Sequence, residues 1–412
     1  MNIGIVTTWF ERGAAYVSRQ YRDVLQKQHR VFIYARGEDD AKQDPAWNTA
    51  GVTWGKRRRY GIKTAIDLKD FRRWLEANRI ELVIFNEQHW WLPILLCNEL
   101  GIKTGAYVDY YTEETVSFFA CYDFLLCNTR RHYSAFAWHP QCFYIPWGTD
   151  LAVFKPQQLE PVAPGSVTFF HSSGLSPKRK GTDLVIDAFA DMPSQARLVI
   201  HSQRSLKLAL PELAEKIQML ESAGRLICRD ETVPAPGLYH LGDVYVYPSR
   251  LDGIGLTIAE ALACGLPVIT TDHPPMNEFV EPGINGQLVS VERLIARADG
   301  YYWSQALASL PNLRQQMLVY VEHLAELGQF KTRARQYAEE KLNWQRNAEC
   351  LIEYVDKVRK QSKEQTQTIS RSIQEYEEQR TAWAHRHENI FYAATLLYSP
   401  LKYFQKLLRS QK

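Results

Sequence analysis

Carboxylates and glycines gather in a short stretch of the chain, from Asp252 to Glu260. Gly253 and Gly255 lie where an apolar run, residues 244–247, gives way to a helical pattern, so the backbone can approach a ligand closely. Free N–H groups at the start of a helix favour an anion. Glu260, about one turn into that helix, can accept hydrogen bonds from hydroxyl groups at the same mouth. These features suit a nucleoside-diphosphate sugar, with N–H groups for the diphosphate and a carboxylate for the ribose.

A second anion site is predicted before another helix. Residues 172–181 contain glycines, small hydroxyls and the three consecutive cations Lys178, Arg179 and Lys180, and a helical pattern follows over residues 182–191. Cations before a helix N-terminus favour an anion on physical grounds. A solvated run of surface charge is the alternative interpretation.

Alternating strand and helix patterns must position these loops. Such alternation is typical of parallel sheets, whose ligands bind beyond the carboxyl ends of the strands. The strand-like runs are residues 2–7, 30–35, 81–85, 103–108, 123–127 and 141–146 in the first half, and 167–171, 198–201, 226–228, 244–247 and 266–270 in the second. Residues 151–165, with three prolines and no periodicity, are interpreted as a linker.

The stretch 243–289 resembles the donor-site signature of retaining GT-B glycosyltransferases of family four. Asp252 and Glu260 match that family's Glu-x7-Glu pair, and Gly253-Ile254-Gly255 matches its Gly-Phe-Gly turn. The signature continues in the family's order through Gly265-Leu266-Pro267-Val268, Glu278 and Gly283-x-x-Gly286. The resemblance covers about residues 1–358. It implies an α/β GT-B fold, with two doubly wound, Rossmann-like parallel-sheet domains facing across a cleft.

The predicted division is residues 1–150 as the acceptor-side domain, 151–165 as the linker, 166–358 as the nucleotide-sugar domain with crossover helices, and 359–412 as a helical extension. Residues 291–358 are predicted to be mostly helical, and the piece around Trp344 matches the family's last helices.

The resemblance also implies roles for residues of the donor site. Glu260 would hold the ribose and Asp252 the sugar hydroxyls, although Asp252 is one methylene shorter than the usual Glu. The backbone at Gly253 and over Gly255-Leu256-Thr257 would contact the diphosphate. Glu278 would lie near the donor sugar, with a loop-stabilising carboxylate as the alternative.

Cations of the other loop would complete the donor site by resemblance. Lys180 would bind the diphosphate. Gly174 occupies the place of the family's Arg, and Arg179 would supply the missing charge. Gly13, before the first helix pattern, matches the loop that covers the diphosphate from the N-terminal side, with a plain loop as the alternative. The chain has no Gly-x-Gly-x-x-Gly, so a nicotinamide site has no support.

Candidates for the acceptor side follow two strands of the first half. The polar and aromatic residues 86–91 come after one strand, with a cap for the next helix as the alternative. Asp109 comes after another, where family members carry a His-Asp pair and this chain has Val108-Asp109. We therefore predict Asp109, rather than a histidine, as an acceptor contact or base.

Composition bounds the class of protein. The chain has 412 residues, 45% hydrophobic content and a net charge of +3, which is too small to imply nucleic acid. Its seven cysteines include no Cys-x-x-Cys pair. Because its first residues form a strand pattern, we predict no signal peptide there. Because no apolar run approaches the length of about 20 residues that a membrane span needs, a cytoplasmic location is predicted.

Two segments are candidates for contact with a membrane surface. The basic run 56–60 is either solvated surface or a patch on acidic phospholipid. Residues 360–382 predict an exposed helix with a thin apolar seam at Ile369, Ile373 and Tyr376. Residues 383–412 are aromatic, aliphatic and basic, which suits an interfacial helix on the inner face of a membrane, with a partner protein or the chain's own surface as the alternative.

The residues also bound the reaction. There is no Asp-x-Asp pair, so a metal clamp has no support, and no cofactor is predicted beside the sugar donor as co-substrate. We predict transfer of a hexosyl unit to a hydroxyl acceptor, in cell-envelope polysaccharide or lipid-linked glycan synthesis. Asp252, Glu260, Lys180 and Asp109 are the predicted catalytic residues. A nucleotide-sugar epimerase and a non-catalytic scaffold of the same fold are the alternatives.

Overall fold

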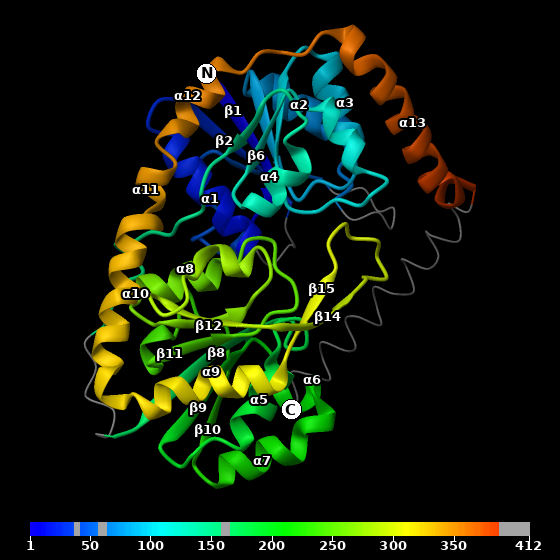
Figure 1. Cartoon of the computed structure of the whole chain (residues 1–412). Helices are drawn as coiled ribbons and strands as arrows, with labels where there is room; N and C mark the ends of the chain where they lie inside the picture. Colours follow the sequence, from blue (N-terminus) through cyan, green and yellow to red (C-terminus); the bar gives the residue numbers. More distant parts are fainter. Residues whose placement is uncertain (37–41, 57–63, 158–164, 387–412) are drawn as a thin grey trace. The chain divides into compact units, whose positions relative to one another are not determined.

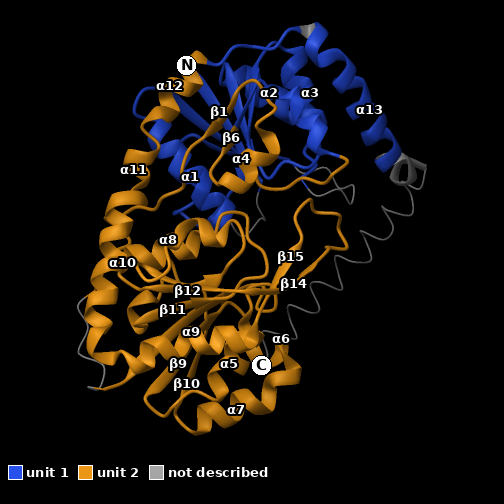
Figure 2. Ribbon diagram, in the orientation of Figure 1, with its two compact units in different colours: residues 1–107, 115–125, 358–412 blue, residues 108–114, 126–357 orange. Residues whose placement is uncertain are grey.

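The computed structural model describes residues 1–36, 42–56, 64–157 and 165–386 (Figure 1). Its contacts divide the chain into two compact units (Figure 2). Unit 1 consists of residues 1–107, 115–125 and 358–412, and unit 2 consists of residues 108–114 and 126–357. Of the predicted linker, residues 158–164 lie outside the described residues, as do residues 57–60 of the basic run and 387–412 of the tail.

The first sheet has seven strands in the order β3-β2-β1-β4-β5-β6-β7. The order reverses between β1 and β4, which is the switch point of a doubly wound fold, and β1 pairs in parallel with both neighbours. The strands are β1 (Asn2–Thr8), β2 (Arg30–Arg36), β3 (Val52–Trp54), β4 (Leu82–Asn86), β5 (Lys103–Tyr107), β6 (Phe124–Cys127) and β7 (Cys142–Tyr144). The helices between them are α1 (Gly13–Leu25), α2 (Leu68–Ala77), α3 (Leu92–Glu99), the 3-10 helix η2 (Val116–Cys121) and α4 (Arg130–Phe136).

The second sheet, in unit 2, has six strands in the order β10-β9-β8-β11-β12-β13. It reverses between β8 and β11, so the predicted second parallel sheet is confirmed. The strands are β8 (Val167–Gly174), β9 (Ala196–Ser202), β10 (Leu226–Asp230), β11 (Val244–Tyr247), β12 (Val268–Thr271) and β13 (Gly286–Val289). The helical segments are α5 (Thr182–Ala190), α6 (Leu206–Ala209), η3 (Pro211–Leu213), α7 (Ala214–Ser222), η4 (Tyr239–Leu241), α8 (Leu256–Ala263), η5 (Met276–Phe279) and α9 (Leu310–Glu322).

The core of this sheet explains why its strands read as continuous apolar runs. All four residues of β11, Val-Tyr-Val-Tyr, are buried, as expected for a parallel strand that is covered on both faces. Ile186 and Phe189 of α5 and Leu313 and Met317 of α9 belong to the same buried cluster. The loops that leave β8 and β11 therefore start from a rigid base.

The prediction of a mostly helical segment over residues 291–358 is wrong at its start. Residues 291–308 form an antiparallel hairpin of β14 (Val291–Ile295) and β15 (Gln305–Ala308), drawn in yellow in Figure 1. β14 begins and ends with a β-branched residue, and Asp299-Gly300 lies in the connection, with Gly300 at φ 72°. Asp-Gly between strand-like runs is a hairpin signal, and it outweighs the weak helical periodicity of this segment.

The rest of the described chain, up to residue 386, is mostly helical, as predicted. Unit 2 continues with η6 (Leu324–Glu326), α10 (Leu327–Lys341), α11 (Trp344–Asn347) and α12 (Cys350–Lys357), and unit 1 ends its described part with α13 (Lys363–Arg386). On α13, Ile373 is fully buried and Tyr376 packs edge-on against Phe118 of η2, with ring centroids 5.2 Å apart. The predicted seam is thus the face of α13 that packs onto the rest of unit 1. Within the described ranges, no helix has both the length and the apolar character that a membrane span requires.

Candidate functional site

The loops after β8 and β11 meet in unit 2, where each leads into a helix. Gly181 and Gly255 precede α5 and α8 with φ angles of 75° and 93°, a conformation that favours glycine. A Cβ at Gly181 would lie 2.2 Å from the carbonyl oxygen of Pro248, so only glycine lets the two loops approach this closely. The N–H of Arg250 donates to the carbonyl of Arg179 at 2.8 Å.

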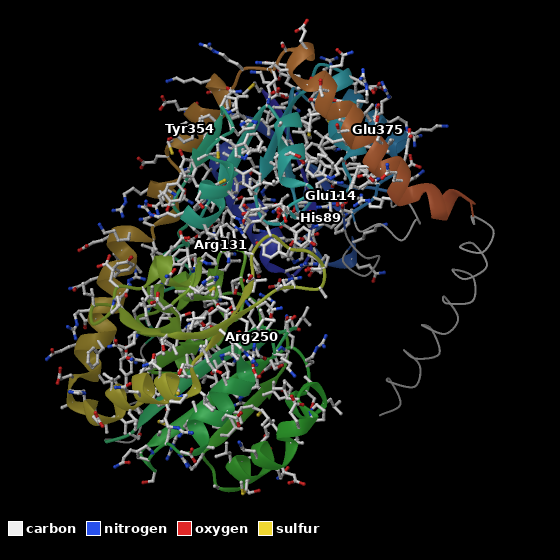
Figure 3. The ribbon with its side chains drawn as sticks, turned by 45° about the vertical axis from the view of Figure 1, so that its right-hand side comes forward. His89, Glu114, Arg131, Arg250, Tyr354 and Glu375 are labelled. Carbon is white, nitrogen blue, oxygen red and sulfur yellow. The ribbon has the colours of Figure 1, made fainter. Side chains whose placement is uncertain are left out.

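An ion pair reinforces this junction. The guanidinium of Arg250 donates twice to Asp183 on α5, at 2.8 and 2.7 Å. Such two-point pairing fixes the relative orientation of the two groups. Arg250 is labelled in Figure 3. The loop after β11 is therefore attached to the first turn of α5.

Three predicted residues, Lys180, Arg179 and Asp252, come together between the loops. Lys180 Nζ lies 2.6 Å from Asp252 Oδ2, and Arg179 Nη1 lies 3.6 Å from Asp252 Oδ1. The hydroxyl of Tyr247, at the end of β11, contacts both Lys180 and Asp252. Tyr247 was not among the predicted site residues, because a tyrosine inside a buried strand reads as core.

Burial and charge act in opposite directions on this pair. Burial alone would raise the pKa of Asp252, but Lys180 and Arg179 outweigh it and hold that pKa well below its ordinary value. Burial lowers the pKa of Lys180 to about 8, with Asp252 opposing the shift. At neutral pH both groups are charged, so one carboxylate, Asp252, faces the two cations Lys180 and Arg179.

Glu260 lies on α8 and is oriented by a tyrosine. Its Oε2 accepts a hydrogen bond of 2.5 Å from the hydroxyl of Tyr239 in η4. Burial raises the pKa of Glu260 to about 6, while the bond from Tyr239 opposes the rise. Gly253, Leu256 and Thr257 complete this part of the predicted set, in the loop before α8 and in its first turn.

Glu278 has a defined structural partner. Its two carboxylate oxygens accept the backbone N–H groups of Arg130 and Arg131, at 2.6 and 3.0 Å. An anionic acceptor at a helix start satisfies N–H groups that have no partner within the helix. The structure thus gives Glu278 the loop-stabilising contacts of the alternative interpretation, and its contact with a donor sugar stays a prediction.

Helix α4 contributes residues that sequence reasoning missed. The guanidinium of Arg131, labelled in Figure 3, donates to the carbonyls of Asp252 and, at 2.7 Å, Pro274. His132 Nε2 lies 3.0 Å from the carbonyl oxygen of Gly253. Both side chains are buried. The cations at residues 130–131 were visible in the sequence, but nothing in their spacing pointed to residues 252–253.

Other predicted residues lie apart from this cluster. Gly13 is the first residue of α1 in unit 1, so it is not among the residues that unit 2 gathers. Asp109 is in unit 2, where its carbonyl accepts a hydrogen bond of 3.1 Å from the Tyr301 hydroxyl. In the cluster 86–91, Trp91 is buried and its N–H donates at 2.9 Å to Glu377 of α13. In the part of the chain that the structure describes, no three His, Cys, Asp or Glu side chains are grouped to hold a metal ion.

Comparison with known proteins bears on this site directly. Residues 166–301, which contain both loops, match the family model described as Glycosyl transferases group 1. This match, which we call the group 1 region, covers about a third of the chain. The group 1 region therefore includes Lys180, Asp252, Glu260 and Glu278, and the resemblance predicted from the donor-site motifs is confirmed.

Relatives extend the comparison beyond the group 1 region. The chain is 32% identical over 128 residues to the lipopolysaccharide core biosynthesis mannosyltransferase LpsB of Rhizobium meliloti, a match that covers 29% of this chain and 36% of LpsB. It is 25% identical over 370 residues to the alpha-monoglucosyldiacylglycerol synthase of Streptococcus pneumoniae, covering 77% of this chain and 81% of that protein. The chain thus spans about a third of LpsB but most of the synthase.

Solved structures show the fold. HepE from Anabaena, in complex with UDP and glucose, superimposes with a TM-score of 0.68 at 17% identity, over 86% of this chain and 99% of that one. WaaG, a glycosyltransferase involved in lipopolysaccharide biosynthesis, gives 0.60 at 15% identity, over 85% and 99%. The predicted GT-B fold is confirmed.

Proposed function

We propose that the chain is a glycosyltransferase that moves a hexosyl unit from a nucleoside-diphosphate sugar to a hydroxyl group. The observation that carries the proposal is the pairing of Lys180 with Asp252 beside the start of α8. Both side chains are only 14% exposed, and burial keeps the pKa of Lys180 below its ordinary value. A buried cation at a glycine-rich helix start is an arrangement that a bound diphosphate would stabilise.

The proposed chemistry assigns roles to residues of unit 2. As the bond between the anomeric carbon and the diphosphate oxygen breaks, its electron pair leaves with the nucleoside diphosphate. Lys180, Arg179 and the N–H groups at the start of α8 would face that growing negative charge. Glu260 would accept the ribose hydroxyls and Asp252 those of the sugar. This division of labour needs neither a metal ion nor a protein nucleophile, in keeping with a retaining transferase.

The proposed acceptor is an envelope polysaccharide or a lipid-linked glycan. The names of two relatives, a lipopolysaccharide core mannosyltransferase and a glucosyldiacylglycerol synthase, support this class. Asp109 is our candidate for an acceptor contact or base. We propose a site of action at the cytoplasmic face of the membrane, with the segment 383–412 as the candidate surface contact.

A donor panel tests the proposal. The full chain is scored with UDP-, GDP-, TDP- and ADP-sugars for thermal shift and for slow hydrolysis, alongside Glu260→Ala. A bound donor stabilises the folded state by mass action. We expect one donor to raise the melting temperature and to be hydrolysed, and Glu260→Ala to lose both effects. Glu322→Ala, which removes an exposed carboxylate from α9 of the same unit, is the matched control and should keep them.

The panel also separates the alternatives. If no sugar nucleotide shifts the melting temperature at millimolar concentration, the proposed donor site is wrong. Conversion of the donor to its epimer without an acceptor would identify an epimerase. Binding without any hydrolysis or transfer, over a range of glycan and glycolipid acceptors, would favour the non-catalytic scaffold.

A further inference from the structure

The connection of the β14–β15 hairpin pairs with a second segment of unit 2. The N–H of Tyr302 donates to the carbonyl of Tyr111 at 2.9 Å, and the Tyr301 hydroxyl donates to the carbonyl of Asp109 at 3.1 Å. The rings of Tyr110 and Tyr301 stack with their centroids 5.1 Å apart. The hairpin, which no donor-site motif includes, is therefore attached to residues 109–112.

From this attachment, a chain of hydrogen bonds leads to the loop before α8. Trp303 Nε1 donates to the Tyr111 hydroxyl at 2.5 Å. That hydroxyl lies 3.1 Å from His132 Nδ1, and His132 Nε2 lies 3.0 Å from the carbonyl oxygen of Gly253. Tyr111 and His132 are both buried. These hydrogen bonds thus join the hairpin to Gly253, the first glycine of the donor-site turn.

Elementary chemistry decides which atom is the donor in each of these hydrogen bonds. The carbonyl of Gly253 can only accept, so His132 Nε2 must carry a hydrogen. Burial, with Arg131 nearby, lowers the pKa of His132 to about 3, so the ring is neutral and its Nδ1 is an acceptor. Tyr111 therefore donates its hydroxyl hydrogen to Nδ1, and burial raises the pKa of Tyr111, which keeps that hydrogen in place. The Tyr111 oxygen is then left to accept from Trp303.

The loop that receives these hydrogen bonds is anchored by the side chains of Asp252 and Ile254, whereas its two glycines have no side chain to pack. A Cβ added at Gly253 would meet no atom within 4 Å, and Gly255 adopts a left-handed conformation. Two groups on α4 instead hold the loop by its carbonyls, Arg131 at Asp252 and His132 at Gly253. The guanidinium of Arg131 also lies 5.5 Å from the ring centre of Trp303, so this tryptophan contacts one holding group directly and reaches the other through Tyr111.

We propose that the β14–β15 hairpin is a positioning element for the loop 252–255. Through Trp303, Tyr111 and His132 it orients the Gly253 carbonyl, and with it the N–H groups that open α8. This inference rests on the proposed function, because it assigns that loop to donor binding. A glycine loop that is ordered before the donor arrives spares the donor the entropy of ordering it.

The variants remove one link each; Tyr111→Phe keeps the shape of the ring, whereas Trp303→Phe also removes one ring of the indole. Trp303→Phe and Tyr111→Phe each remove one polar group, and His132→Gln keeps an N–H that can reach Gly253 while losing the bond to Tyr111. Tyr302→Phe is the matched control, since it removes a hydroxyl from the same connection but from a ring that is 43% exposed and outside the chain.

The first readout needs no ligand. Amide hydrogen exchange over residues 253–257 is compared in the free, full-length variants, because exchange reports local opening of a loop. The loss of one hydrogen bond changes such an equilibrium by about fivefold. We expect exchange to be about fivefold faster than in the wild type in Trp303→Phe and Tyr111→Phe. In Tyr302→Phe the exchange rate should not change. Unchanged exchange in both variants would overturn the inference, whatever the protein binds.

The second readout uses UDP-glucose and GDP-mannose as probes. We expect the two link variants to raise KM for the donor by about fivefold with kcat nearly unchanged. The double variant should raise KM no more than either single variant, because the loss of one hydrogen bond already separates the hairpin from Gly253. In the His132→Gln background, Tyr111→Phe should have no further effect. Additive effects of the variants on KM, or an equal rise of KM in Tyr302→Phe, would contradict the proposed series of hydrogen bonds.

The two proposals fail in different ways. A wild-type protein that binds neither probe nor any other sugar nucleotide, but shows the expected exchange pattern, would refute the donor function and keep the positioning role. Donor turnover with unchanged exchange and unchanged KM in the link variants would keep the donor function and refute the positioning role.

Discussion

Replacement of Asp252 by asparagine tests whether the buried ion pair stabilises the fold. The change preserves the size of the side chain but removes the charge that faces Lys180 at 2.6 Å. Because both side chains are 14% exposed, solvent screens the pair only weakly. Breaking a buried pair leaves an uncompensated charge, so we expect the free energy of unfolding to fall by about 3 kcal/mol at pH 7. For a unit of this size, that corresponds to a melting temperature lower by about 6–12 °C.

The pH dependence gives this prediction its sign. Lys180 and Arg179 outweigh burial and hold the pKa of Asp252 below its ordinary value of 3.8, so the folded protein binds this proton less tightly than the unfolded chain. The stabilisation is therefore fully present above the ordinary pKa and is lost as the pH falls below it. Asparagine cannot titrate. The difference in stability between wild type and Asp252→Asn should narrow as the pH falls below about 4.

Urea unfolding between pH 3 and pH 8 measures both quantities. Asp187→Asn is the control. Asp187 forms an ion pair with Lys216 in the same unit, and the two side chains are 32% and 36% exposed, respectively. A surface pair of this kind contributes no more than about 1 kcal/mol. If Asp252→Asn loses no more stability at pH 7 than Asp187→Asn, or if its deficit stays constant into acid, the account of the buried pair is refuted.

Three further changes have definite expected outcomes. Because burial raises the pKa of Glu260 to about 6, donor affinity of the wild type should weaken as the pH falls through 6, whereas Glu260→Gln should bind weakly at every pH in a calorimetric titration. Gly181→Ala should destabilise unit 2 by about 2 kcal/mol in urea, since it forces a Cβ against Pro248 at a positive φ; equal stability would contradict the close approach of the loops. Ile373→Ala should cost about 3 kcal/mol in unit 1 by the same measurement, and a loss near zero would show that α13 is not packed there.

Much of the architecture could be predicted from local patterns. Apolar runs such as residues 244–247 are long enough to be buried strands, and glycines such as Gly255 mark the points where strands lead into helices. Both loops of the candidate site were identified in this way. The hairpin at 291–308 was missed although Asp299-Gly300 signals it, because short apolar runs fit either period.

The partners of the site residues could not be predicted in the same way. Glu278 reads as a site carboxylate, yet its oxygens cap α4, about 150 residues earlier in the chain, through the N–H groups of Arg130 and Arg131. Trp303 and Tyr111 read as ordinary aromatic residues, and only the fold brings them onto His132. Contacts between segments that are distant in sequence leave no local periodicity to read.

The sequence by itself determined the alternation that builds two parallel sheets, the two glycine-hinged loops, and the cations and carboxylates that those loops contain. These features follow from period, turn chemistry and charge, which act over a few residues. Only the tertiary structure decided which charges meet, which tyrosine orients Glu260, and that Tyr111 and His132 link the hairpin to the Gly253 carbonyl. The physical reason is that burial and hydrogen-bond geometry depend on neighbours that the chain supplies from far away. Those neighbours hold the pKa of Asp252 low and raise that of Glu260.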